Sequence, residues 1–176
     1  MRAKPNLFLI GPMGSGKSAV GRTLARLLDF PFYDSDSEIE RRTGVDIPFI
    51  FEKEGEPGFR QREREAIEAL TALEPVVLAT GGGAVLLAEN RRVLAERGCV
   101  VYLRTSVAQQ ADRVRHGRNR PLLSNVDTAG KLEQLMSERA ELYREIADVT
   151  VDTDLRRVRS VADDILRAIR AARAGG

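Results

Sequence analysis

This chain has few of the residues that form disulfide bonds in small secreted proteins or bind transition metals. Among its 176 residues are one cysteine, Cys99, one histidine, His116, and no tryptophan. A single cysteine cannot form an intramolecular disulfide, and one histidine has no zinc-ligand spacing around it. Apolar runs are short, well below the roughly 20 residues that a membrane-spanning helix needs. The first expected strand begins too soon after Met1 for a signal peptide. We therefore expect a cytoplasmic protein without a membrane partner.

An excess of charge of one sign is also missing. The formal net charge is +2, which by itself gives no argument for a nucleic-acid partner. Lysine is scarce, with four lysines against 24 arginines, so a given arginine is weak evidence of function and Lys17 stands out. The C-terminal stretch is locally basic, but Val158, Val161, Ile165 and Ile169 recur there at helical spacing. This stripe favours a terminal helix packed on the core.

Short apolar runs alternate with helical patterns along the chain. The expected strands cover residues 7–10, 30–33, 76–79, 100–103 and 149–151. The expected helices cover residues 17–28, 38–42, 47–54, 59–73, 91–96, 107–114, 132–144 and 158–169, with a turn at Pro57-Gly58. This alternation predicts an α/β fold, a doubly wound five-stranded parallel sheet with helices on both faces. The length suits one domain, 1–176, and ligands of such sheets bind beyond the carboxyl ends of the strands.

The segment from Gly11 to Ser18 follows the first expected strand and fits the phosphate-binding pattern G-x-x-x-x-G-K-[ST]. Its glycines let backbone N–H groups point at a polyphosphate, and the helix that begins near Gly16 adds the positive end of its dipole. Lys17 would reach the β- and γ-phosphates, and the Ser18 hydroxyl would take one coordination position on Mg²⁺. The alternative is a glycine-rich turn that binds nothing. The strand expected before the segment and the helix expected after it argue against this alternative.

Two further groups follow the second and third expected strands. Asp34 and Asp36 would point the same way in an extended segment, where they could support Mg²⁺ or act as a base for an acceptor hydroxyl. Helix capping is the alternative. Gly81, Gly82 and Gly83 could bring the backbone close to a ligand, and a tight strand–helix crossing is the alternative. Both groups are expected at the same sheet edge as the P-loop.

Several arginines stay ambiguous from their spacing alone. Periodicity is lost over residues 115–127, where Arg118 and Arg120 lie in a polar, basic loop. Such a loop could be a mobile lid over phosphates, and a solvated surface loop fits equally well. Arg60 and Arg139 lie in charged helices whose ordinary interpretation is a solvated face with local ion pairs.

Taken in order, these motifs resemble those of the shikimate kinase family. The resemblance runs from about residue 7 to residue 153. It rests on the P-loop and on Phe32-Tyr33-Asp34-Ser35-Asp36, Gly58-Phe59-Arg60, Ala79-Thr80-Gly81-Gly82-Gly83, Arg120-Pro121-Leu122-Leu123, and Glu138-Arg139 with Tyr143. It implies the fold of nucleoside monophosphate kinases and the phosphorylation of the 3-hydroxyl of shikimate by ATP, on the route to chorismate and the aromatic amino acids. The expected partner is shikimate, bound by a monomer that contacts neither nucleic acid nor membrane.

The resemblance also implies a role for each matching residue. Mg²⁺ would be held by Ser18 directly and by Asp34 through water. The nucleotide would be bound by Gly14, Ser15, Gly16, Lys17, Ser18, Ala19, the lid residue Arg120 and, near the adenine, Arg156. Shikimate would be bound by Asp36, Arg60, Gly81, Gly82, Gly83 and Arg139. The catalytic residues would be Asp36 as the base, Lys17 and Arg120. A substrate-binding lobe would span residues 34–62 and a lid residues 115–127.

Two other classes of protein share a P-loop. One is a small kinase for gluconate or nucleotides, and Asp34-Ser35-Asp36 together with Arg60 argues against both substrates. Gluconate lacks the ring that the turn at residues 81–83 would contact, and a nucleotide kinase needs a base-recognition pocket that is not visible in the sequence. The other is a nucleotide-dependent switch, which would hydrolyse nucleotide without an acceptor.

Overall fold

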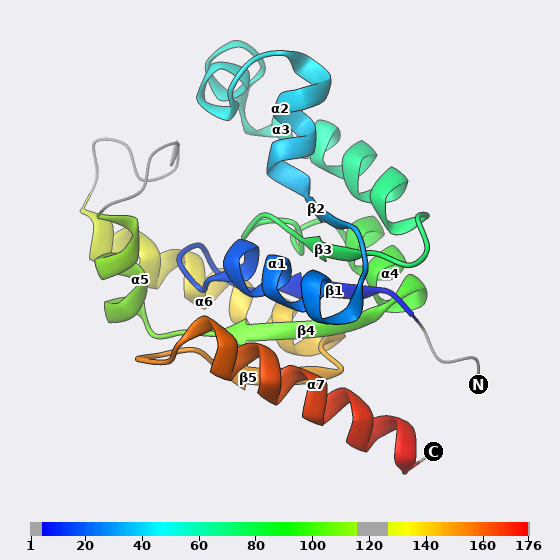
Figure 1. Ribbon diagram of the computed structural model, residues 1–176. Coiled ribbons are helices and arrows are strands. Elements are labelled where there is room, and N and C mark those ends of the chain that lie inside the picture. The colour runs from blue at the N-terminus through cyan, green and yellow to red at the C-terminus, as the bar shows by residue number, and fades with distance from the viewer. Residues whose placement is uncertain (1–4, 116–126, 176) are drawn as a thin grey trace.

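The computed structural model describes residues 5–115 and 127–175. Within them, parallel strands form one five-stranded sheet in the order β2-β3-β1-β4-β5 (Figure 1). The strands are β1 (Leu7–Ile10), β2 (Phe32–Asp34), β3 (Val77–Ala79), β4 (Cys99–Arg104) and β5 (Val149–Asp152). The helices are α1 (Lys17–Leu28), α2 (Ser35–Thr43), α3 (Ile47–Thr71), α4 (Ala88–Arg97), α5 (Val107–Val114), α6 (Thr128–Ile146) and α7 (Val158–Ala174). The doubly wound α/β fold expected from the sequence is confirmed.

Helices cover both faces of the sheet. Leu24 of α1 and Ile165 of α7 belong to one apolar core, which includes Leu9 of β1. The second core, on the other face, is formed by the C-terminal half of α3 with α4 and α6, packed against Phe8 and other residues of the sheet. Within the described segments, no helix is both long and apolar enough to cross a membrane.

The strand register places the loops of interest side by side. Leu9 of β1 pairs with Ala79 of β3 on one side and with Val101 of β4 on the other. The segments that follow β1 and β3 therefore start next to each other at the carboxyl edge of the sheet. This is the edge where parallel α/β sheets bind their ligands.

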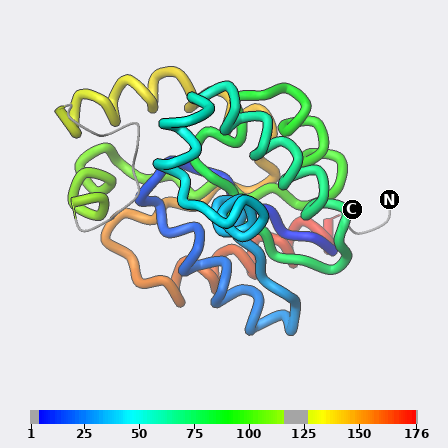
Figure 2. The backbone as a smooth tube through the Cα atoms, turned by 90° about the horizontal axis from the view of Figure 1, so that it is seen from above, coloured from blue at the N-terminus to red at the C-terminus, as the bar shows by residue number. Residues whose placement is uncertain are grey.

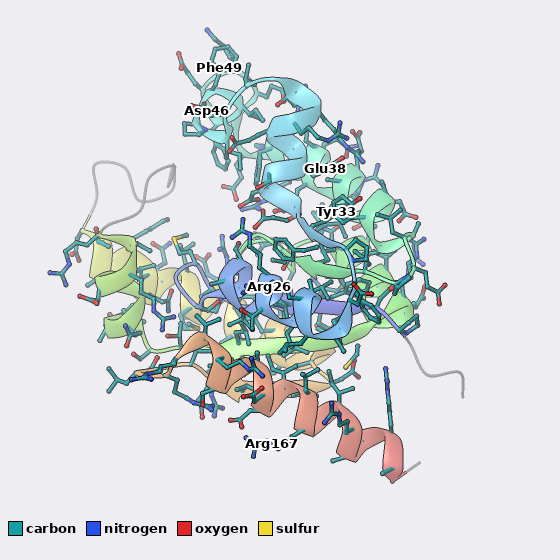
Figure 3. The ribbon with its side chains drawn as sticks, viewed as in Figure 1. Arg26, Tyr33, Glu38, Asp46, Phe49 and Arg167 are labelled. Carbon is teal, nitrogen blue, oxygen red and sulfur yellow. The ribbon has the colours of Figure 1, made fainter. Side chains whose placement is uncertain are left out.

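A helical projection rises from this edge (Figure 1). It consists of α2 and the first half of α3 and has a small apolar core of its own, which includes Ile39, Ile50 and Phe59. Asp46 and Phe49 lie at its far end (Figure 3). α2 ends at Gly44, which has a φ of 73° and donates its N–H to Glu40 O at 2.9 Å.

The turn predicted at Pro57-Gly58 is wrong. α3 runs from residue 47 to residue 71 and is kinked at Gly55, whose φ of 71° and ψ of −177° are not helical. Pro57 lies in the first turn after the kink, where a helix does not need its missing N–H. The expected break in the helix therefore occurs at Gly55, and the chain resumes helix without a separate turn.

Candidate active site

The P-loop joins β1 to α1 at the centre of the sheet. α1 begins at Lys17, directly after Gly16, whose φ of 90° lies in the left-handed region that glycine tolerates best. The Lys17 side chain is buried, and its Nζ donates to the carbonyls of Gly11 at 2.7 Å and Pro12 at 2.9 Å. The ammonium group therefore lies against its own loop, where a polyphosphate would meet the backbone N–H groups.

Asp34 contacts the P-loop helix and caps α2 at the same time. Its Oδ2 accepts from the Ser18 hydroxyl at 2.6 Å, and its Oδ1 accepts from the N–H groups of Asp36 at 3.0 Å and Ser37 at 3.1 Å. α2 consequently begins at Ser35, three residues before the predicted start. Asp36 thus lies in the first turn of a helix, not in extended chain as predicted. The capping alternative is correct for Asp34, and the same carboxylate also reaches the P-loop.

A cavity of about 430 Å³ lies at this edge of the sheet. Its volume is within the roughly 300–1,000 Å³ typical of small-molecule sites. The walls come from the P-loop, α1, the β2–α2 junction, the β3–α4 connection and α5, and include Gly14, Gly16, Lys17, Ser18, Ala19, Asp34, Asp36, Gly81, Gly82 and Arg113. The structure therefore brings most of the predicted phosphate-binding residues together with Asp36 and two of the three glycines.

The glycine turn, residues 81–83, is packed too closely for side chains. A Cβ on Gly81 would lie 2.8 Å from Asp36 Oδ1 and 2.9 Å from Glu63 Oε2, and one on Gly83 would lie 2.6 Å from Arg60 Nη1. The N–H of Gly81 donates to Ser35 Oγ at 3.0 Å. Glycine is needed here because the backbone passes directly over functional side chains.

Tyr143 of α6 holds the middle of this turn. Its hydroxyl donates to the carbonyl of Gly82 at 2.6 Å, and its ring stacks on Tyr102 with centroids 5.0 Å apart. Burial raises the pKa of Tyr143, so the hydroxyl keeps its proton. Arg139, one helical turn earlier, has its Nη1 3.6 Å from the position of a Cβ on Gly82.

Arg60 and Arg139 are buried rather than solvated. Arg60 is 9% exposed and Arg139 is 4% exposed. Arg60 Nη1 donates to Glu63 Oε1 at 2.9 Å, and its Nη2 donates to Glu56 Oε1 at 3.2 Å. Burial raises the pKa of Glu63, against the opposing effect of Arg60 and Arg139. The solvated-face interpretation is therefore wrong for both arginines, which place two positive charges next to the glycine turn.

Some predicted nucleotide contacts are not found at this cavity. Arg118 and Arg120, together with the rest of segment 116–126, lie outside the described residues. Arg156 lies two residues before α7, and its Nη2 is 2.5 Å from Asp164 Oδ2 and 2.7 Å from Ser160 Oγ. Arg156 is not one of the described residues that line the cavity. Its place near the adenine stays a prediction.

Sequence reasoning did not single out two charged residues of this region. Arg113 of α5 lines the cavity and donates to the carbonyls of Gly14 at 2.7 Å and Thr153 at 3.3 Å. Arg113 follows β4, whose carboxyl end lies at the same edge of the sheet. This position in the chain could have indicated that Arg113 belongs to the site. Glu63 lies three residues after Arg60, a spacing that places both on one face of a helix.

A P-loop whose serine is paired with an aspartate, facing buried arginines across a glycine turn, defines a kinase of small anionic molecules. The family model described as shikimate kinase matches residues 13–170. The shikimate kinase of Methylococcus capsulatus is 55% identical over 168 residues, which cover 96% of this chain and 94% of that protein. The chain belongs to the shikimate kinase family.

Solved structures agree with this assignment. The shikimate kinase from Acinetobacter baumannii, solved in complex with shikimate, superimposes with a TM-score of 0.94 and 50% sequence identity, covering 96% of this chain and 94% of that chain. A gluconokinase from Sinorhizobium meliloti superimposes with a TM-score of 0.62 at 18% identity, covering 97% of this chain and 95% of that chain. At this lower identity the likeness shows the shared fold alone.

Proposed function

We propose that this protein transfers the γ-phosphoryl group of ATP to the 3-hydroxyl of shikimate, giving shikimate 3-phosphate and ADP on the route to chorismate. The observation that carries the proposal is the meeting of the P-loop, Asp36 and the glycine turn at one cavity, with Arg60 and Arg139 packed beside that turn. Phosphoryl transfer depends on holding two reactants in line and on neutralising charge. Family membership and 50% identity to a structure solved with shikimate support this acceptor.

On the nucleotide side, Lys17 exchanges its bonds to the P-loop carbonyls for the β- and γ-phosphates. Residues 14–19 surround the N-terminus of α1, where backbone N–H groups and the helix dipole favour anions. Arg113 adds a positive charge at the same wall. Arg120 would cover the phosphates from the lid, and Arg156 would lie near the adenine.

The oxygen atoms at the cavity wall fit Mg²⁺. Within the part of the chain that the structure describes, no three His, Cys, Asp or Glu side chains gather as a metal cage. Mg²⁺ does not require one, because it keeps several waters and binds one or two protein oxygens together with substrate phosphates. Ser18 would hold it directly, since its proton is donated to Asp34 and an oxygen lone pair is left for the cation. Asp34 would hold it through water. The bound cation would neutralise charge on the phosphates.

On the acceptor side, Asp36 binds and orients the hydroxyl group. The reaction forms a bond between the 3-oxygen of shikimate and the γ-phosphorus, and it breaks the bond from that phosphorus to the oxygen bridging to the β-phosphate. ADP leaves with the electrons of the broken bond, and the hydroxyl proton passes to the Asp36 carboxylate. The transition state is loose, so early removal of this proton is not required.

Arg60 and Arg139 bind the carboxylate of shikimate from behind the glycine turn. A guanidinium group offers two parallel N–H donors that match the two oxygens of a carboxylate. Glu63 and Glu56 fix the Arg60 side chain by accepting from it at 2.9 Å and 3.2 Å. Backbone groups of the glycine turn would contact the ring of the acceptor.

We further propose that the chain acts as one kinase domain, a cytoplasmic monomer, with a substrate-binding lobe at residues 34–62 and a lid at 115–127. The packing of α7 supports a structural role for the basic C-terminal helix, because Val161, Ile165 and Ile169 are buried. Val158, predicted as part of this stripe, is 38% exposed. Light scattering coupled to size-exclusion chromatography measures the oligomeric state.

A coupled assay of ADP release tests the proposed reaction. The purified protein is mixed with ATP and Mg²⁺ and offered shikimate, quinate, gluconate or nucleoside monophosphates in separate reactions. We expect turnover with shikimate and formation of shikimate 3-phosphate by mass spectrometry. Absence of turnover with shikimate would reject the proposal, turnover with gluconate alone would indicate a sugar-acid kinase, and ADP release without any acceptor would indicate a nucleotide switch.

A further inference from the structure

Two buried donor groups beside the P-loop have no acceptor among the described residues. One is Nε2 of Gln110, a side chain of α5 that is 1% exposed, and the other is Nε of Arg139 on α6, which is 4% exposed. A buried N–H without a partner is costly, and native proteins satisfy nearly all such groups with protein atoms or ordered water. Two unsatisfied donors close to a ligand site therefore require an explanation.

Both side chains line the same small cavity. It lies between the P-loop and α6 and is also lined by Pro12, Met13, Tyr143 and Met136. Its volume is about 10 Å³, close to the roughly 10–15 Å³ that a single water molecule requires. α5 and α6 lie side by side at this end of the molecule (Figure 2).

We propose that one buried water in this cavity accepts hydrogen bonds from Gln110 Nε2 and Arg139 Nε, and that Gln110 is a positioning residue for Arg139. The inference rests on the proposed function, in which Arg139 binds the shikimate carboxylate. A water oxygen has two lone pairs, so it can satisfy both donors at once. The bridge fixes the Nε edge of the guanidinium, so that Nη1 is held next to the glycine turn.

α5 packs against the P-loop, and this packing fixes the position of Gln110. The Cα of Gln110 lies 3.3 Å from the position of a Cβ on Gly14, and Arg113, one turn further along α5, donates to the Gly14 carbonyl at 2.7 Å. The water bridge therefore links the phosphate-binding loop to an arginine of the acceptor site. Through it, the orientation of Arg139 depends on the position of α5.

A neutral amide suits this position better than a carboxylate. Gln110 can donate to a water without adding a negative charge near Arg139. A glutamate there would pair with the guanidinium directly and compete with the carboxylate of the substrate. Gln110→Glu should therefore weaken shikimate binding more than removal of the polar group does.

Gln110→Met tests the bridge, because methionine has a similar length but no donor. We expect KM for shikimate to rise about 3- to 10-fold, the effect of losing one hydrogen bond that orients a charged group. KM for ATP and kcat should stay within about twofold, and the melting temperature should not fall, because the variant buries no unsatisfied amide. The matched control is Gln134→Met on the exposed side of α6, which should leave all four quantities unchanged.

A purely structural role for Gln110 would change the melting temperature and leave the KM for shikimate unaltered. An unchanged KM for shikimate in Gln110→Met would overturn the proposal. A crystal structure of the wild-type protein supplies an independent test, since it should show one density peak within hydrogen-bond distance of both nitrogen atoms, and an empty cavity would also overturn it. If the wild type does not phosphorylate shikimate, the proposed function fails, and the crystal structure still decides the bridge.

Discussion

The hydroxyl of Tyr143 provides a sharp test of how the glycine turn is held. Tyr143→Phe removes one oxygen atom and keeps the ring and its stack on Tyr102, 5.0 Å between centroids. The bond that is lost is short, 2.6 Å to the carbonyl of Gly82, and Tyr143 is 1% exposed. Gly82 is half-buried, so its carbonyl can regain part of the lost bond from water, and we expect the free energy of unfolding to fall by about 1 kcal/mol. For a chain of this length, that corresponds to a melting temperature roughly 2–4 °C lower.

Urea denaturation and steady-state kinetics measure the two consequences. Because the turn contacts the acceptor site, KM for shikimate should rise about 3- to 10-fold, whereas KM for ATP should not change. Tyr33→Phe is the matched control, since it removes the same atom from a tyrosine that is 37% exposed (Figure 3). We expect the control to stay within about 0.5 kcal/mol of the wild type. A Tyr143→Phe protein with wild-type stability and wild-type KM would refute the argument that this bond holds the turn.

Three further predictions concern charged residues. Arg60→Lys and Arg139→Lys should each raise KM for shikimate about tenfold or more, because lysine cannot form the paired donors that a carboxylate accepts, and an unchanged KM in both would remove them from the acceptor site. Asp36→Asn should keep the fold and the affinity for ATP, measured by calorimetry, but lower kcat by about 10²- to 10⁴-fold; near-normal kcat would end its proposed role. The hydrogen bonds from Arg41 and, to a smaller extent, from Arg42 lower the pKa of Glu38 from its usual 4.5 to about 2. The stabilisation by Glu38 is therefore complete above pH 4.5 and lost as the pH falls toward 2, and Glu38→Gln should flatten this part of the stability–pH curve in urea titrations.

Local sequence patterns were sufficient for the sheet and for most helices. The strand at residues 7–10 and the helices at 17–28 and 107–114 have the predicted bounds. Their signals are confined to a few neighbouring residues, such as an apolar run before glycine or a helical stripe after it. The same kind of signal predicted the break at Gly55 correctly but misled at Pro57-Gly58, because a proline can open a helix as well as form a turn.

Burial of charge could not be predicted in the same way. Arg60 and Glu63 lie in a helix where acidic and basic residues alternate, a pattern typical of a solvated face. They are buried because the glycine turn packs on them, so closely that a Cβ added to Gly83 would lie 2.6 Å from Arg60 Nη1. This contact joins segments more than 20 residues apart. Only the resemblance to a family indicated a function for Arg60, and neither pattern nor resemblance indicated the partner Glu63.

If Lys17 binds the β- and γ-phosphates as proposed, the hydrogen bonds that it makes within its own loop should affect which phosphates are bound. Its Nζ donates to two carbonyls, at 2.7 Å and 2.9 Å. A ligand that binds Lys17 has to break these two hydrogen bonds first. Only the difference in free energy between the hydrogen bonds that form and those that break contributes to affinity. A triphosphate, which is long enough to span the loop, would compensate for this exchange with more backbone N–H contacts than an isolated sulfate or phosphate ion would. The loop should thus bind a triphosphate more tightly than an isolated inorganic anion.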